Sequence, residues 1–153
     1  MKKRGGIVSE SIEGPILSRK EERLGLMLWF RLSRLYNQSV RESNQHLRAW
    51  NLSAAQFDIL VQVGTHERLS QQELADKLLV TKGNITQLLS KMEDMGIMIR
   101  EQQWKTKYLA LTEQGKELYQ EVVPRQEQFQ ASQFSALSSE EKKQLLELLR
   151  KLQ

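Results

Sequence analysis

The sequence predicts a mostly α-helical protein with a small two- or three-stranded β wing. Apolar residues recur at three- and four-residue steps over most of the chain, and short apolar runs of strand type occur near residues 97–111. The length of 153 residues, with 39% apolar and 27% charged residues, suits one ordinary globular unit.

Composition excludes several classes of protein. The chain has no cysteine, which excludes disulfides, thiolate zinc sites, a cysteine nucleophile and thiol-based redox sensing. The longest apolar run, Leu24–Phe30, is far shorter than the roughly 18–20 residues that a bilayer-spanning helix needs. No apolar core of a secretory signal follows the basic residues at the start. We therefore expect a cytoplasmic protein.

The net charge of +4 arises in two regions. Residues 1–20 hold five basic and two acidic groups and residues 77–107 hold six and three, whereas 21–76 and 108–153 each hold six and seven. A polyanion is expected to bind at the excess of positive charge in residues 77–107. Residues 1–20 form a basic N-terminal arm. This arm either grips the same polyanion or is a loose tail, and the sequence leaves both alternatives open.

A long amphipathic helix is expected within residues 21–50. Its apolar stripe consists of Leu24, Leu28, Leu32, Leu35 and Tyr36, with arginines interleaved. Since Met27, Trp29 and Phe30 broaden this stripe, the helix either packs on a second chain or is an internal core helix.

Capping signals set the bounds of the next helices. Ser53–Gln56 and Ser70–Glu73 fit capping boxes, and Thr81 is a good N-cap. Gly64 and Gly96 suit the left-handed conformation after the second and fourth helices. The sequence thus predicts a short third helix, a tight connection and a longer fourth helix.

A ribbon and two further helices complete the chain. The apolar runs 97–100 and 108–111 predict a β ribbon connected by residues 101–107. Thr112 caps a fifth helix, which Pro124 must kink or interrupt because proline lacks an amide hydrogen. A last capping box at Ser138–Glu141 opens a helix whose stripe needs a partner, formed by Leu145, Leu148, Leu149 and Leu152.

The order of these elements is that of a winged helix-turn-helix, in which the fourth helix enters the major groove of DNA. Its amide side chains suit adenine, its lysines suit guanine or phosphate, and its threonines suit phosphate or a thymine methyl group. The residues expected to contact DNA from this helix are Thr81, Lys82, Asn84, Thr86, Gln87 and Lys91. The alternative is a merely solvated polar face.

Further contacts are expected on both sides of this helix. Ser70, Gln71 and Gln72 surround a helix terminus that attracts phosphate. From the ribbon, the expected DNA contacts are Arg100, Lys105 and Lys107. For Trp104 two roles are open, a wedge or stacking residue on DNA and a residue that pins the ribbon to the body.

Four segments carry a resemblance to a known family: Leu69–Ala75, Val80–Thr86, Leu88–Arg100 and Leu109–Lys116. In their order and spacing, residues 22–152 resemble the MarR family of bacterial transcriptional regulators. The resemblance implies a homodimer that reads a pseudo-palindromic operator. It implies the following division: a dimerisation helix at 21–50, a winged helix-turn-helix domain at 51–112 and C-terminal dimerisation helices at 113–153.

The wing departs from the family pattern. Members usually have a longer tip with an Asp-x-Arg element whose arginine enters the minor groove, whereas Gln102–Thr106 is short and has neither residue. Phosphate contacts by Lys105 and Lys107 are expected instead, and minor-groove readout is left open.

The resemblance also implies a regulator, expected to be a repressor, that is released from DNA by a small aromatic or anionic ligand. The candidate pocket residues are Trp29, Tyr36, His46, Trp50 and Phe57, with Arg31 or Arg34 as counter-charge. The alternatives are core packing of these aromatics in a constitutive regulator without a ligand, and a winged-helix module that binds protein. No enzyme, metal site or cofactor is expected, because His46 and His66 are the only imidazoles and no phosphate loop or metal-ligand cluster occurs.

Overall fold

The computed structural model describes residues 14–78 and 82–153, and the described residues divide into two compact units between Tyr36 and Asn37. The first unit carries the greater part of α1 (Arg19–Leu47), a 29-residue helix that continues into the second unit. A 3-10 turn (Arg48–Trp50) follows α1, so the helix predicted to reach residue 50 ends three residues earlier. Within the described ranges no helix is both long enough and apolar enough to cross a membrane.

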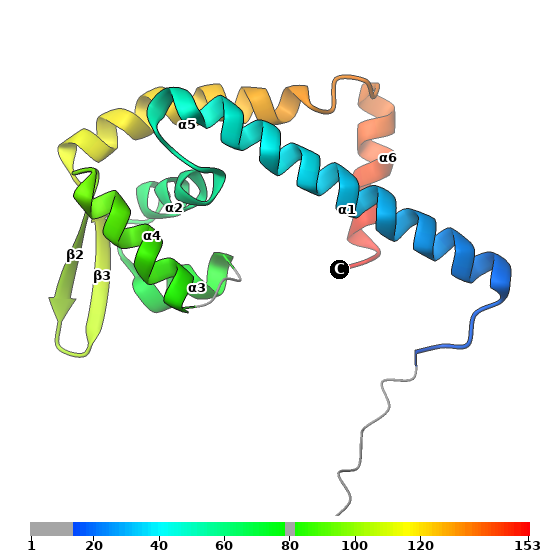
Figure 1. The fold of residues 1–153 in the computed structure, drawn as a ribbon, viewed down its shortest axis with the longest axis horizontal. Coiled ribbons are helices and arrows are strands. Elements are labelled where there is room, and N and C mark those ends of the chain that lie inside the picture. The colour runs from blue at the N-terminus through cyan, green and yellow to red at the C-terminus, as the bar shows by residue number, and fades with distance from the viewer. Residues whose placement is uncertain (1–13, 79–81) are drawn as a thin grey trace, which may run out of the picture. The chain divides into compact units, whose positions relative to one another are not determined.

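The second unit contains the remaining helices and the strands (Figure 1). Its helices are α2 (Ala54–Thr65), α3 (Gln71–Leu78), α4 (Lys82–Asp94), α5 (Glu113–Ser132) and α6 (Ser139–Arg150). The predicted order of two helices, a short helix, a longer helix, a ribbon and two more helices is therefore confirmed.

Helix starts lie where the capping signals predicted them. The Ser53 hydroxyl accepts a hydrogen bond from the Gln56 amide while the Gln56 side chain accepts one from the Ser53 amide, which satisfies two backbone groups at the start of α2. Ser138 and Glu141 form the same reciprocal box at α6, and the Thr112 hydroxyl accepts from the Gly115 amide at α5. Thr81 lies outside the described residues.

The two glycines that were predicted to close helices differ. Gly96 has a φ of 75° just after α4, as predicted for a left-handed C-terminal residue. Gly64 instead lies inside α2, so its predicted role as a terminator is wrong. A Cβ at Gly64 would collide with the ring of Tyr119, so the glycine permits α5 to approach α2 closely.

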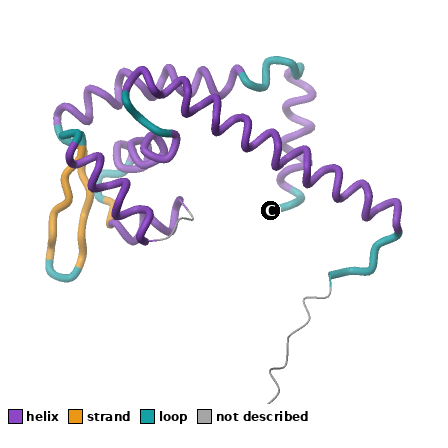
Figure 2. The backbone as a smooth tube through the Cα atoms, in the orientation of Figure 1, coloured by secondary structure: helices purple, strands orange, loops and turns teal. Residues whose placement is uncertain are grey.

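The β wing is a hairpin with one additional short strand (Figure 2). Strands β2 (Met98–Gln103) and β3 (Thr106–Leu111) pair antiparallel up to Gln103 opposite Thr106, and β1 (Leu69–Ser70) pairs with the other edge of β3. The strands thus extend over most of residues 101–107, which the sequence predicted as a connection. A turn of only two residues remains at the tip.

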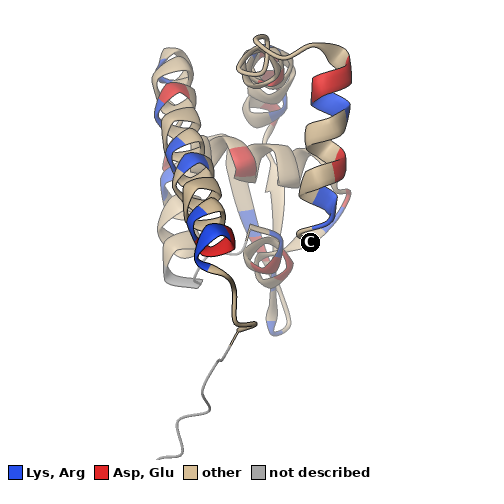
Figure 3. Cartoon of the chain, turned by 90° about the vertical axis from the view of Figure 1, so that its right-hand side faces the viewer, with Lys and Arg blue, Asp and Glu red and all other residues tan. Residues whose placement is uncertain are grey.

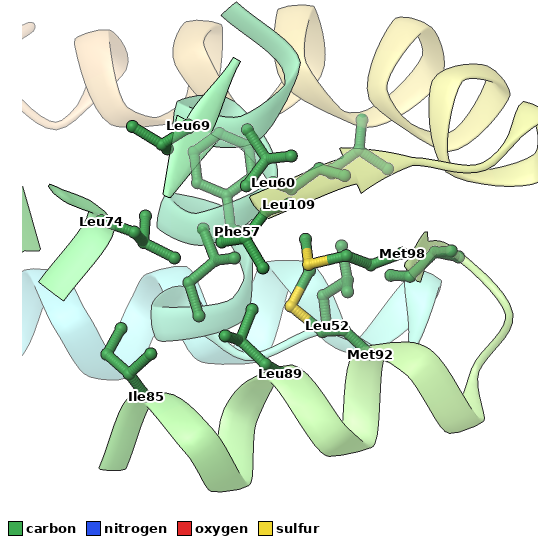
Figure 4. Close-up of a cluster of buried hydrophobic side chains, with 14 of the residues drawn as sticks. Leu52, Phe57, Leu60, Leu69, Leu74, Ile85, Leu89, Met92, Met98 and Leu109 are labelled. Carbon is green, nitrogen blue, oxygen red and sulfur yellow. The ribbon is translucent and has the colours of Figure 1, made fainter. Parts of the chain in front are cut away.

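The core of the second unit holds α4 against the sheet and α2 (Figure 4). Ile85, Leu89 and Met92 are fully buried on one side of α4. They meet apolar side chains from α2, α3 and both long strands, namely Phe57, Leu60, Leu74, Met98 and Leu109. Burial of this kind is worth about 1.5–3 kcal/mol per large apolar side chain, so it fixes the rotation of α4 about its axis.

Helix α5 is continuous through Pro124, so the predicted alternative of a break at this residue is wrong. Its first turn lies directly on the backbone of the wing. The Thr112 amide donates to the Ile97 carbonyl, at an N–O distance of 3.2 Å, and a Cβ at Gly115 would collide with that same carbonyl. Glycine is therefore needed where α5 meets the residue before β2.

We predict that Gly115→Ala destabilises the protein by about 2 kcal/mol or more, because the new methyl group meets backbone that cannot move independently. Urea unfolding of the full chain measures this loss. Gln120→Ala, at an exposed position of the same helix, is the matched control and is expected to change stability by less than about 0.5 kcal/mol. Equal stability of the two variants would contradict the close approach at Gly115.

Candidate nucleic-acid interface

Helix α4 presents a polar face on the side away from the core. The predicted contact residues on the described part of this face are all exposed: Asn84, Thr86, Gln87 and Lys91. Lys82 is described only as the first residue of α4. Since the buried face fixes the helix rotation, the polar residues point together into solvent, as readout of base edges requires.

The start of α3 is bound to the start of α4. Gln71 Nε2 donates to Thr86 Oγ1 at 3.1 Å, and Gln72 Nε2 donates to Asp76 Oδ1 at 2.9 Å. The Gln71 side chain therefore links the two helices, whereas the Gln72 side chain is bound along α3 itself.

Ser70 has a different environment from its predicted neighbours. It is buried, and its hydroxyl accepts from the Glu73 amide while the Glu73 carboxylate accepts from the Ser70 amide. These hydrogen bonds lower the pKa of Glu73 below its ordinary value. The structure thus shows Ser70 as the cap of α3, and a phosphate contact by its hydroxyl stays a prediction.

A hollow of about 380 Å³ lies between α3, the start of α4 and the hairpin. It brings together five residues that the sequence predicted separately: Gln71, Gln72, Thr86, Lys105 and Lys107. Its other lining residues are Ala75, Ile85, Gln102 and Thr106, so both charged groups in the lining are cationic. A cationic hollow with amide and hydroxyl groups suits an anionic phosphate backbone.

Arg100 lies apart from this hollow and has partners of its own. Its Nη2 donates to Glu93 Oε2 at 2.5 Å and to Ser90 Oγ at 3.2 Å, which ties β2 to the second half of α4. The hydrogen bond to Arg100 is the main cause that lowers the pKa of Glu93. These hydrogen bonds give the Arg100 guanidinium a bracing role between β2 and α4. A DNA contact by Arg100 stays a prediction.

Sequence reasoning missed a second brace on the hairpin. The Arg68 guanidinium lies 3.9 Å from the centroid of the Tyr108 ring, and its Nη2 donates to Gln103 Oε1. Arg68 precedes β1, so it spans from the edge strand across β3 to the end of β2. A cross-strand contact of this kind leaves no local sequence signal.

Trp104 occupies the tip of the hairpin and is 97% exposed. The alternative in which it pins the ribbon to the body is therefore wrong. Its backbone has a φ of 56°, which is uncommon for a bulky residue.

The candidate pocket residues do not form one described cavity. His46 stacks on Phe129 with a 4.4 Å centroid distance and lies 5.4 Å from the Trp50 ring, so these aromatics gather where the end of α1 meets α5. Phe57 is instead part of the core. Trp29 and Tyr36 belong to the first unit, where both are exposed.

Two polar contacts lie beside this aromatic cluster, whereas the buried Gln126 Nε2 has no hydrogen-bond partner among the described residues. His46 Nδ1 lies 2.6 Å from Gln126 Oε1, and Trp50 Nε1 donates to Glu121 Oε1 at 3.0 Å. Within the described ranges no group of three or more His, Asp or Glu residues is placed to hold a metal ion.

Comparisons with known proteins agree with this geometry. The family model described as MarR family matches residues 52–104. An uncharacterised HTH-type transcriptional regulator of Bacillus cereus is 42% identical over 134 residues, which cover 87% of this chain and 91% of that protein. The transcriptional repressor MprA of Escherichia coli is 31% identical, over 74% of this chain and 67% of its own length.

A solved structure shows the same fold. It is that of Bordetella bronchiseptica BpsR, reported for the regulation of its DNA binding by 6-hydroxynicotinic acid. The match has a TM-score of 0.75 and 22% sequence identity, and it covers 82% of this chain and 98% of that one.

We predict that the ion pair of Glu93 and Arg100, between α4 and β2, makes a pH-dependent contribution to the free energy of unfolding. Because Arg100 lowers the folded-state pKa of Glu93, the pair stabilises the protein above the ordinary value of 4.5, and this stability is lost as the pH falls through the lowered pKa. Glu93→Gln is expected to cost about 1 kcal/mol at neutral pH and nothing in strong acid, since both side chains are partly exposed.

Urea unfolding of wild type and variant from neutral to acidic pH measures this effect. Glu101→Gln, on the exposed side of β2, is the control and should shift stability little at any pH. If the difference in free energy of unfolding between wild type and Glu93→Gln stayed constant with pH, this result would argue against the ion pair.

Proposed function

The chain belongs to the MarR family of HTH-type transcriptional regulators, and from this we propose that it is a sequence-specific repressor that binds a pseudo-palindromic operator as a homodimer. Membership makes it a DNA-binding regulator rather than an enzyme. The repressor assignment rests on its similarity to a relative named a transcriptional repressor. Such a protein acts where DNA is, which supports the expected cytoplasmic location.

One observation carries the proposal most directly. The exposed polar face of α4 lies beside a hollow whose charged lining residues are Lys105 and Lys107. Amide side chains such as those of Asn84 and Gln87 read adenine edges in the major groove, while the lysines neutralise phosphates of the flanking backbone. A winged helix that docks on protein would be expected to carry acidic or apolar groups there.

The homodimer is supported by exposed apolar surfaces in each unit. In the first unit α1 exposes Leu24, Met27, Leu28, Trp29, Phe30 and Leu32. In the second unit α6 and the end of α5 line an apolar hollow formed by Ala131, Phe134, Leu145, Leu146 and Leu149, with Lys142 at its rim. Single soluble chains rarely expose this much apolar surface, so a second copy is the proposed cover.

Release by a small aromatic anion is also part of the proposal. It is supported by the reported regulation of BpsR by 6-hydroxynicotinic acid and by the aromatic cluster of His46, Trp50 and Phe129. A ligand acts here only if it binds the geometry that is incompetent for DNA more tightly than the competent one. A constitutive regulator without a ligand is the alternative.

We predict that the full chain is a dimer in light scattering and that it enriches pseudo-palindromic fragments from random duplex DNA. Adding a panel of aromatic carboxylates should weaken binding to the selected duplex if a ligand releases the protein. Unchanged binding across the panel would favour the constitutive alternative. A monomer that binds no duplex at low salt would contradict the operator proposal itself.

We predict further that base readout and backbone contact separate by mutation. Gln87→Ala or Asn84→Ala should cost about 1–3 kcal/mol at the selected duplex and relax preference at one position per half-site. Lys105→Ala is the matched comparison, expected to weaken binding to every duplex and to reduce the salt slope by about one unit. If the α4 variants weakened all sequences equally, base readout by this face would be contradicted.

A further inference from the structure

The tip of the hairpin carries an aromatic side chain with no partner in the described chain. Trp104 is 97% exposed, against 68% for Trp29, an aromatic residue on the surface assigned to the dimer. Leaving an indole ring in water forgoes the burial that makes tryptophan favourable in a fold. The fold of this chain therefore gives no reason for tryptophan at position 104.

The backbone gives no reason for it either. Trp104 is the first residue of a two-residue hairpin turn and has a φ of 56°. Hairpins usually place Gly, Asn or Asp at such a position, because a bulky side chain is strained there. The Gln102 side-chain amide donates to the Trp104 carbonyl at 2.7 Å, which holds the strained turn in place.

The surroundings of the ring are cationic and braced. Residues 102–107 include Lys105 and Lys107 and no acidic residue, and Figure 3 shows a basic residue at the turn of the hairpin. Arg68 braces the outer part of the hairpin through Tyr108 and Gln103. The tip is therefore a rigid aromatic projection beside positive charges, next to the hollow that suits phosphate.

We propose that Trp104 enters the minor groove beside each half-site and wedges its ring between adjacent base pairs, while Lys105 and Lys107 bind the flanking phosphates. The inference rests on the proposed operator binding and adds a residue that deforms the duplex. Apolar wedges of this kind unstack a base step and kink the duplex by about 20–90°. The strained turn is kept because it projects the ring away from the body of the protein.

Two variants of the full chain separate the ring from the turn. Trp104→Asn removes the ring and suits the positive φ, so the free protein should gain about 2–4 °C in its midpoint of thermal unfolding while its affinity for the selected duplex falls about tenfold or more. Trp104→Phe keeps an aromatic wedge and should bind within a few-fold of wild type. A ring needed only for folding would instead lower the unfolding midpoint on removal.

Duplex geometry gives the decisive measurement. With the selected duplex labelled at both ends, energy transfer should report a kink with wild type and with Lys105→Ala, and a straighter duplex with Trp104→Asn. 2-Aminopurine placed in the flank of each half-site should brighten with wild type and stay dim with Trp104→Asn, because unstacking raises its emission.

The wedge is overturned if Trp104→Asn binds and bends the duplex as wild type does. Should Gln87→Ala weaken binding in the same series, operator recognition by α4 would stand while the wedge alone fails. Normal binding and bending by Trp104→Asn, combined with lost repression in transcription by purified RNA polymerase, would assign the ring to a protein partner and also overturn the wedge. A wild-type chain that selects no duplex removes the proposed function together with this inference.

Discussion

The burial of one side of α4 is the constraint on which the interface depends. Ile85, Leu89 and Met92 are fully buried at three- and four-residue steps, so the helix cannot rotate without exposing them. Each side chain contributes about 1.5–3 kcal/mol by burial, so the three together exceed the roughly 1–3 kcal/mol of discrimination from one good contact to a base. The helix can therefore present Asn84 and Gln87 in a fixed direction without support from DNA.

The hairpin depends on contacts of another kind. A two-stranded ribbon has little apolar surface to bury. Here polar side chains at two positions along the strands attach the ribbon to the rest of the unit. Arg100 bonds to Glu93 and Ser90 near the base, and Arg68 lies on Tyr108 farther out. Because these braces are partly exposed ion pairs and stacking contacts, they are weaker than the core and more sensitive to pH and salt than α4 is.

The sequence predicted what is encoded locally. Capping boxes at Ser53 and Ser138 located helix starts, because a cap involves residues only three apart. Prediction from the sequence failed where a contact with a distant residue decides the local structure. The Tyr119 ring leaves no room for a side chain at Gly64. Phe57 packs in the core, apart from the aromatic residues at the end of α1. For the interface, the α4 face was predictable from period and polarity, whereas the brace by Arg68 and the exposure of Trp104 depend on strand pairing that no short segment specifies.

In the proposed complex the two parts of the interface read different properties of DNA. There, contacts by the amide side chains of α4 depend on the identity of base edges and change little with salt, because amides release no counterions. Contacts from the hairpin depend on phosphate charge and on how readily the duplex deforms, which varies with sequence even where no base edge is touched. An operator can then be selected at positions that α4 never reaches, provided that the hairpin stays rigid enough to transmit the cost of deformation. In the proposed complex the braces by Arg68 and Arg100 supply that rigidity, a role that the sequence analysis assigned to neither residue.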